Sequence, residues 1–113
     1  MLAKKELQDR VKAYPDFPKK GVMFFDMMPL LASHECLTAC VAHLAESLAG
    51  VKASYVVGLE SRGFLLGVPL AMKLGMGFIP LRKKGKLPGK VISVEYELEY
   101  GKDCIEMQEG VLK

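Results

Sequence analysis

Two apolar runs with a helical segment between them constrain the fold of this chain more than any other feature. Residues 54–59 and 77–81 are short, rich in β-branched and other apolar side chains, and typical of buried strands. Residues 64–74 have the composition of a buried helix, which Gly75 ends and in which Pro69 is the weakest position. Strand, helix and strand in this order predict a right-handed βαβ unit with a parallel pair of strands, and so an α/β fold.

The first half of the chain predicts two helices around an irregular segment. Residues 22–31 are apolar but contain a proline, and favour a loop or an irregular edge strand. Ser33 is the predicted N-cap of a longer helix that ends at Gly50. An amphipathic helix is predicted over residues 2–14, from apolar residues at helical spacing: Leu7, Val11 and Tyr14. The apolar stripe of the longer helix consists of Leu37, Cys40, Val41, Leu44, Ala45 and Leu48.

The second half continues with a basic loop and a strand. Residues 82–90 hold five basic residues, two glycines and a proline, with no acidic residue, and predict a loop. After this loop, apolar and polar residues alternate strictly, which predicts a half-exposed antiparallel strand. The apolar positions are Ile92, Val94, Tyr96, Leu98 and Tyr100.

Composition favours one globular domain over residues 1–113. Half of the residues are apolar and 26% are charged, which excludes a disordered chain and suffices for one modest core. The longest uncharged apolar run is far shorter than the roughly 20 residues that a membrane span requires. Three cysteines, an odd number, do not form a disulfide framework, so we expect a cytoplasmic, reduced protein.

The turn after the first predicted strand, residues 58–63, is the first candidate site. Ligands of open α/β sheets bind just outside the carboxyl ends of the strands, and a helix N-terminus there favours anions. Arg62 adds a permanently charged planar donor. The turn is neither a Walker A loop, since Phe64 and Leu65 replace its Lys and Ser/Thr, nor a G-x-G-x-x-G loop. The alternative is an ordinary strand-to-helix turn with Ser61 as N-cap.

The basic loop is the second candidate, because it follows the neighbouring parallel strand. Two basic loops at adjacent strand ends suggest a ligand with several negative charges, such as a phosphate or pyrophosphate. The alternative is a solvated surface loop. The third reading, nucleic-acid binding, is disfavoured by a pI of only about 8.8 and by the lack of aromatic residues among the lysines.

Two further groups of polar residues have simpler interpretations. Glu95, Glu97 and Glu99 fit the solvent face of the predicted strand, and one of them is a general acid or base only if that strand folds over the pocket. Cys36, Cys40 and His43 lie on one predicted helix without the spacing of a known zinc site. We therefore expect Cys40 to be buried as a small apolar residue and Cys36 to lie on the flanking surface.

Four motifs in a fixed order carry a family resemblance. They are Pro15-Asp16-Phe17-Pro18 with Gly21, Val22 and Phe24; Gly58-Leu59-Glu60-Ser61-Arg62-Gly63-Phe64; Arg82-Lys83-Lys84-Gly85-Lys86-Leu87-Pro88-Gly89; and Leu98-Glu99-Tyr100-Gly101-Lys102. Together they closely resemble adenine phosphoribosyltransferase, a type I phosphoribosyltransferase family, over roughly residues 7–109. The resemblance implies an incomplete Rossmann-like type I phosphoribosyltransferase domain with an antiparallel flap strand.

The resemblance also implies an activity and partners. The family works in purine salvage: it joins adenine to phosphoribosyl pyrophosphate and releases AMP and pyrophosphate. It uses Mg2+, bound chiefly through the pyrophosphate substrate, with no metal ligand assigned on this chain. The implied protein is cytoplasmic and homodimeric, and binds neither nucleic acid nor membrane.

Roles for particular residues follow from the same resemblance. The pyrophosphate-binding residues are Glu60, Ser61, Arg62, Arg82 and Lys86, and the peptide bond in the first of these loops is often cis in the family. Glu99 and Tyr100 match a mobile flap, in which Glu99 exchanges a proton with the purine. The segment 22–26 matches the hood over adenine, with Met23, Phe25 and Arg62 as adenine-binding residues.

The sequence departs from the family pattern in two places. Phe25 stands where the family usually has an arginine, and so an aromatic side chain replaces a cation near the base. The family signature that binds the ribose 5-phosphate is expected shortly after Gly110, and residues 111–113 do not contain it. We therefore expect an N-terminal part of the domain. The alternative function is a non-catalytic short isoform or paralogue that binds purine or pairs with a full-length subunit.

Overall fold

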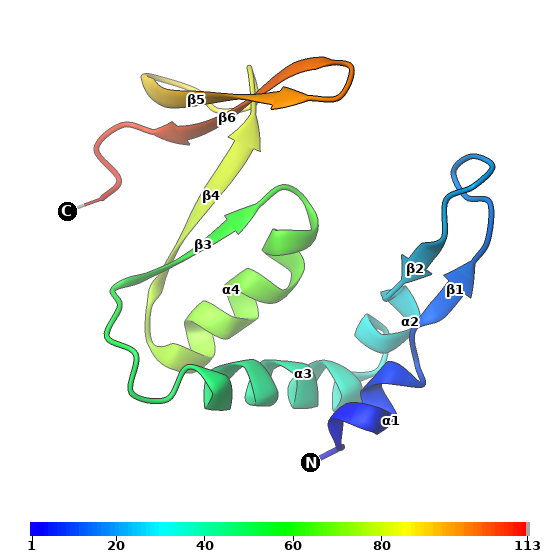
Figure 1. Cartoon of the computed structure of the whole chain (residues 1–113). Helices are drawn as coiled ribbons and strands as arrows, with labels where there is room; N and C mark the ends of the chain where they lie inside the picture. The colour runs from blue at the N-terminus through cyan, green and yellow to red at the C-terminus, as the bar shows by residue number, and fades with distance from the viewer. Residues whose placement is uncertain (113) are drawn as a thin grey trace. The chain divides into compact units, whose positions relative to one another are not determined.

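The computed structural model describes residues 1–112, which form two compact units that meet between Ala49 and Gly50. Unit 1 contains two strands and three helices (Figure 1): α1 (Lys4–Gln8), β1 (Lys12–Tyr14), β2 (Phe24–Asp26), α2 (Met28–Leu31) and α3 (His34–Ser47). Unit 2 contains β3 (Tyr55–Leu59), α4 (Arg62–Leu74), β4 (Gly77–Lys83), β5 (Val91–Leu98) and β6 (Gly101–Gln108). None of the helices within residues 1–112 is long and apolar enough to span a membrane.

The core of unit 1 lies where α1 and α2 pack on α3. It consists of Leu7, Leu30, Cys36 and Ala39, all of them buried. The predicted stripe on α3 is confirmed at Val41, which is buried, and wrong at its cysteine, since Cys36 is fully buried whereas Cys40 is only partly buried. Apolar residues cover a wide arc of this helix, and the packing partners decide which part of the arc is inside.

The ends of the unit 1 helices follow local chemistry. The prediction of one helix over residues 2–14 is wrong, because the helix ends at Gln8 and the chain then forms β1, which pairs antiparallel with β2. The short helix α2 is a second difference. Its proline lies in the first turn, where a missing N–H costs nothing, and Asp26 Oδ1 accepts the N–H of Met28 at 2.9 Å. The N-cap of α3 is confirmed, since Ser33 Oγ accepts the N–H of Cys36.

Unit 2 is built on a four-stranded mixed sheet in the order β3-β4-β6-β5 (Figure 1). Strands β3 and β4 are parallel, with α4 between them in the chain, which confirms the predicted βαβ unit. Strand β4 extends past β3 and pairs antiparallel with β6, and β5 and β6 form a hairpin. The antiparallel strand predicted from the alternating residues is therefore present as β5, and β6 is an additional strand.

Glycines let α4 lie close to the sheet. The aromatic ring of Phe78 on β4 lies so near that a Cβ on Gly67 would be 2.5 Å from its Cε1 atom, and a Cβ on Gly58 would be 2.7 Å from its Cζ atom. The ring also packs edge-on against Phe64, with centroids 5.8 Å apart. Helix α4 continues through Pro69 and ends at Gly75, which has a left-handed φ of 71°.

Three expectations about unit 2 need correction. Strand β3 is not buried on both faces, because Val57 is 51% exposed on the face away from α4. Arg82 and Lys83 belong to β4 rather than to the basic loop, since both pair with β6. The apolar side of β5 is open, with Val94 65% exposed, because the two-stranded ribbon curves away from α4 and no helix or strand among the described residues of unit 2 covers it.

Candidate functional site

The turn at the carboxyl end of β3 holds the first group of predicted site residues. The N–H of Glu60 donates to the carbonyl of Leu81 at 2.9 Å, which continues the parallel pairing of the two strands by one residue. The Glu60–Ser61 peptide bond is cis, as the family resemblance implied. Ser61 occupies the N-cap position of α4, but its hydroxyl makes no capping hydrogen bond among the described residues. Arg62 begins the helix, and the helix dipole places partial positive charge at this N-terminus, which favours an anion.

Glu60 joins this turn to the end of β4. Its Oε1 atom accepts the backbone N–H of Lys83 and lies 3.7 Å from Nε of Arg82. The Arg82 guanidinium also donates from a terminal nitrogen to the carbonyl of Lys86, at 3.5 Å. The Arg82 side chain is 35% exposed, so part of a five-donor fork stays accessible to a ligand. The structure thus brings together the ends of two predicted basic loops around one arginine.

Nε of Arg82 is a buried donor without a hydrogen bond within residues 1–112. Its carboxylate neighbour is beyond hydrogen-bonding distance, and a buried unsatisfied donor costs on the order of 1–3 kcal/mol. A catalytic role, a bound ion or an ordered water accounts for such a group in proteins, and the terminal nitrogens of the partly exposed Arg82 side chain are open to a ligand. This guanidinium is therefore the best candidate in unit 2 for binding an anion.

A second ion pair links the β5–β6 ribbon to the end of β4. Nζ of Lys83 donates to Oδ2 of Asp103 on β6. The hydrogen bond from Lys83, and then the backbone N–H of Cys104, lower the pKa of the Asp103 carboxyl. The same hydrogen bond raises the pKa of the Lys83 amine. A hollow beside this pair is lined by Leu59, Glu60, Leu81, Arg82, Lys83, Tyr96 and Ile105.

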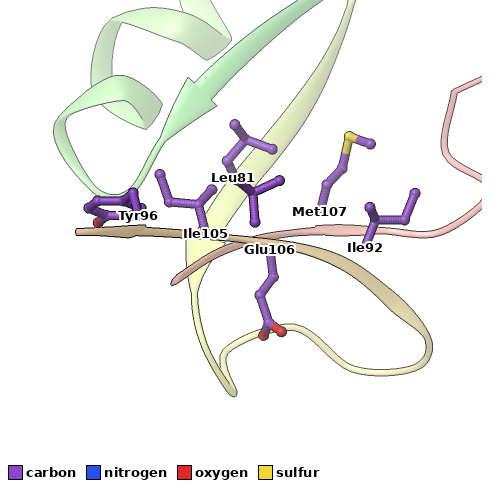
Figure 2. A pocket seen from close by; sticks show the side chains of 7 residues that line it. Leu81, Ile92, Tyr96, Ile105, Glu106 and Met107 are labelled. Carbon is purple, nitrogen blue, oxygen red and sulfur yellow. The ribbon is translucent and has the colours of Figure 1, made fainter. Parts of the chain in front are cut away.

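Glu106 on β6 is a buried carboxylate that the sequence analysis missed. Its pKa is lowered by a hydrogen bond from the Ser93 hydroxyl first, and by one from the backbone N–H of Gly85 second. In the sequence, Glu106 is a glutamate within residues 101–108, and this segment has no long alternation of apolar and polar residues that would predict a buried position. An apolar hollow on the ribbon is lined by Leu81, Ile92, Val94, Tyr96, Ile105, Glu106 and Met107, and Figure 2 shows that the Glu106 carboxylate points away from the apolar side chains.

The predicted flap residues lie at the tip of the ribbon. Leu98 pairs with Gly101, so Glu99 and Tyr100 form the two-residue turn between β5 and β6. Both are exposed, and Tyr100 is 91% exposed. None of the hydrogen bonds or ion pairs found within residues 1–112 joins either residue to Glu60 or Arg82. Within residues 1–112 the flap is thus not bonded to the Glu60–Arg82 site, and the catalytic role of Glu99 stays a prediction.

The predicted adenine-binding residues of the hood belong to unit 1. Met23 precedes β2 and Phe25 lies within it, and both side chains are more than half exposed. Phe25 points to the opposite face of β2 from Phe24, whose ring packs edge-on against Phe17 at 5.2 Å. That other face has its own hollow, lined by Tyr14, Phe17, Phe24 and Asp26. An exposed phenyl ring on Phe25 is available for stacking on a flat ligand.

Resident metal ligands are not gathered in the described part of the chain. No three His, Cys, Asp or Glu side chains within residues 1–112 come together in a way that would hold an ion. The carboxylate nearest to the anion candidate, Glu60, already accepts from Lys83 and faces Arg82. These residues do not fit a protein-held Mg2+ centre.

The curated relatives and solved structures that are similar to this chain carry the same name. No protein-family model matches it. A curated adenine phosphoribosyltransferase of Trichormus variabilis is 50% identical over 109 residues, which are 95% of this chain and 63% of that protein. The crystal structure of adenine phosphoribosyltransferase from Thermoanaerobacter pseudethanolicus superposes with a TM-score of 0.91 at 44% identity, over 95% of this chain and 62% of that one.

A third relative was solved with ligands. It is the adenine phosphoribosyltransferase of Saccharomyces cerevisiae in complex with adenine and an imino-altritol bisphosphate, with a TM-score of 0.87 and 43% identity. The match covers 96% of this chain and 64% of that one, so the chain spans a little under two thirds of its relatives' length. Sequence and structure together show that this chain is a homologue of the adenine phosphoribosyltransferases, with the type I phosphoribosyltransferase fold over the part that it spans.

Proposed function

We propose that this chain serves purine salvage by carrying the pyrophosphate-binding and adenine-binding residues of an adenine phosphoribosyltransferase. In this reaction a nitrogen of adenine attacks the anomeric carbon of phosphoribosyl pyrophosphate, the bond from that carbon to pyrophosphate breaks, and AMP forms. The observation that carries the proposal is the Arg82 guanidinium beside Glu60, at the ends of two parallel strands. Its support is the relatives that share this chain's fold and nearly half of its residues.

Arg82 and Arg62 are the proposed stabilisers of the leaving group. Pyrophosphate gains negative charge as the bond to the anomeric carbon breaks, so fixed positive charge near its oxygens lowers the barrier. A guanidinium binds two phosphate oxygens at once and stays charged at every physiological pH. The N-terminus of α4, with Ser61 at its N-cap, and Lys86 in the basic loop add to this field.

Phe25 and Met23 are the proposed base contacts, together with Arg62. Purine rings stack on aromatic faces, and the exposed ring of Phe25 supplies such a face. The yeast relative was solved with adenine bound, which supports a purine as the base.

Glu99 and Tyr100 are the proposed catalytic residues. A carboxylate that closes over the base exchanges a proton with the purine ring while the new bond forms. Closure of a two-stranded ribbon also excludes water from a cation-like centre that water would otherwise attack. The exposed position of both residues at the ribbon tip is compatible with such a movement.

Mg2+ is proposed as part of the substrate rather than as a resident ion. Mg2+ keeps several water ligands and commonly binds through substrate phosphates, so phosphoribosyl pyrophosphate brings it to the site. A cytoplasmic homodimer is the proposed form of the protein. Both of these proposals follow the family resemblance, and gel filtration tests the homodimer.

The decisive experiment is the formation of AMP from adenine and phosphoribosyl pyrophosphate, followed by HPLC. The 113-residue chain is assayed together with any longer product of the same gene, with hypoxanthine as the control base. AMP formation that requires adenine and Mg2+ is the expected result for the catalytically competent form. If no form makes AMP while the chain still binds adenine or pairs with a full-length subunit, the non-catalytic alternative replaces the proposal.

A further inference from the structure

Glu106 is the one charged side chain that is buried within residues 1–112, with 7% of its surface exposed. It lies on β6, across from Arg82 on β4 and from Ser93 on β5, in the middle of the three-stranded part of the sheet. Burying a carboxylate is costly unless its oxygens are hydrogen-bonded. A carboxylate buried at this position therefore requires hydrogen-bond donors at its oxygens.

Both oxygens of this carboxylate have a donor. Oε1 accepts the backbone N–H of Gly85 at 2.9 Å, and Oε2 accepts the Ser93 hydroxyl at 2.6 Å. An ionised carboxylate accepts at both oxygens, and its charge makes both hydrogen bonds stronger than those of a neutral amide. The two contacts therefore fit an ionised Glu106.

The Gly85 contact fixes the backbone of the basic loop. Gly85 has a left-handed φ of 83°, and the next residue, Lys86, supplies the carbonyl that accepts from the Arg82 guanidinium. The far end of the loop is held separately, by Gln108 Nε2 on the carbonyl of Pro88 and by the N–H of Glu109 on the carbonyl of Lys90. The Glu106 side chain is bound to the part of the loop that touches Arg82.

We propose that Glu106 is a positioning residue for pyrophosphate binding, which holds Gly85 so that the Lys86 carbonyl orients the Arg82 guanidinium toward the ligand. The inference rests on the proposed function, because it assumes that Arg82 binds pyrophosphate. A misplacement of about 1 Å at a binding group commonly costs on the order of 100-fold. Loss of one orienting contact, with a second weak contact from Glu60 still present, is expected to cost about tenfold.

The direction in which the pyrophosphate affinity changes distinguishes a positioning role of Glu106 from a purely electrostatic effect of its charge. A carboxylate near an anion site repels the anion, so removal of Glu106 by charge alone strengthens pyrophosphate binding. Positioning requires the opposite, since Glu106→Ala frees the loop and weakens binding. Glu106→Gln keeps an acceptor for Gly85 but loses the charge, and is expected to bind with intermediate affinity.

The test is calorimetric titration of the chain with inorganic pyrophosphate in Mg2+ buffer, together with the NMR shift of the Gly85 amide. We expect the dissociation constant to rise about tenfold in Glu106→Ala and less in Glu106→Gln. The Gly85 amide shifts strongly in Glu106→Ala. Glu97→Gln, an equal charge change on the exposed side of β5, is expected to change neither quantity.

Two outcomes would overturn the positioning role of Glu106, and only one of them also overturns the proposed function. Unchanged or tighter pyrophosphate binding by both Glu106 variants overturns the positioning role and leaves the proposed function standing. If the wild-type chain binds no pyrophosphate while the Gly85 amide still responds to Glu106→Ala, the proposed function fails and Glu106 is left with a structural role only. Ser93→Ala, which removes the other partner of Glu106, keeps the test usable if Glu106→Ala does not fold, and is expected to weaken binding by less than Glu106→Ala.

Discussion

Oε1 of Glu60 lies 3.7 Å from Nε of Arg82 and accepts the backbone N–H of the next residue, Lys83. One carboxylate thus joins the turn after β3 to the end of β4. The contact to Nε is too long for a hydrogen bond. Nε of Arg82 therefore lies near a carboxylate but has no hydrogen-bond acceptor within residues 1–112.

Replacement of Arg82 by alanine tests the leaving-group role. Arg82→Ala is expected to cost about 2–4 kcal/mol of transition-state stabilisation, as for other lost donors to a developing anion. The measurement is kcat/KM for AMP formation. Arg82→Lys, which keeps the charge but loses the planar fork, is expected to recover only part of the loss. Wild-type kinetics in both Arg82→Ala and Arg62→Ala would refute the pyrophosphate role.

A methyl group on Gly67 is expected to destabilise unit 2. The added Cβ would be 2.5 Å from Cε1 of Phe78, so helix and strand must move apart, at a cost of about 1–3 kcal/mol in the free energy of unfolding. Urea denaturation measures this change. Phe78→Leu in the Gly67→Ala background removes part of the clash, so the two effects are expected to be non-additive. Met72→Ala, at an exposed position of α4, is the control.

Acid is expected to destabilise the ribbon through Glu106. Hydrogen bonds from Ser93 and Gly85 and the charge of Lys84 hold the pKa of Glu106 below its ordinary value of 4.5, and Arg82 is its cross-strand neighbour. The unfolded chain therefore binds the proton first as the pH falls. This contribution to stability is complete above about pH 4.5 and is lost as the pH falls through the lower folded pKa.

Urea unfolding at several acid pH values measures this dependence. The pKa of Asp103 is also lowered, so Asp103 adds to the same acid limb. Glu106→Gln is expected to flatten the limb, and Asp103→Asn to flatten it independently. A slope that is identical in wild type and Glu106→Gln contradicts the ionised state of Glu106.

Phe25 is expected to limit the affinity for the base. Phe25→Arg adds hydrogen-bond donors that a phenyl ring lacks, and one new hydrogen bond to a purine nitrogen contributes about 1 kcal/mol, or roughly fivefold in affinity. Titration with adenine measures the change. Phe25→Leu, which removes the stacking face, is expected to weaken adenine binding. Equal adenine affinity in all three proteins contradicts the placement of Phe25 at the base.

Local patterns predicted several elements of both units because their determinants are local. The N-cap at Ser33 in unit 1, and the β-branched run of β3 and the left-handed Gly75 in unit 2, each depend on neighbours in the chain. The family motifs predicted which loops carry charge. They did not predict β1 or the short helix α2, since both are too short for a periodic pattern to distinguish them from a turn.

Periodicity and motif order predicted the βαβ unit, the alternating strand β5 and the family resemblance, since both are properties of the chain alone. Contacts between elements, which no local pattern contains, put Cys36 rather than Cys40 inside, place Arg82 within a strand, and let Glu106 hold the basic loop. These outcomes depend on which elements meet. A residue on β6 becomes a partner of Gly85, more than twenty residues earlier, only because β4, β6 and β5 pair side by side.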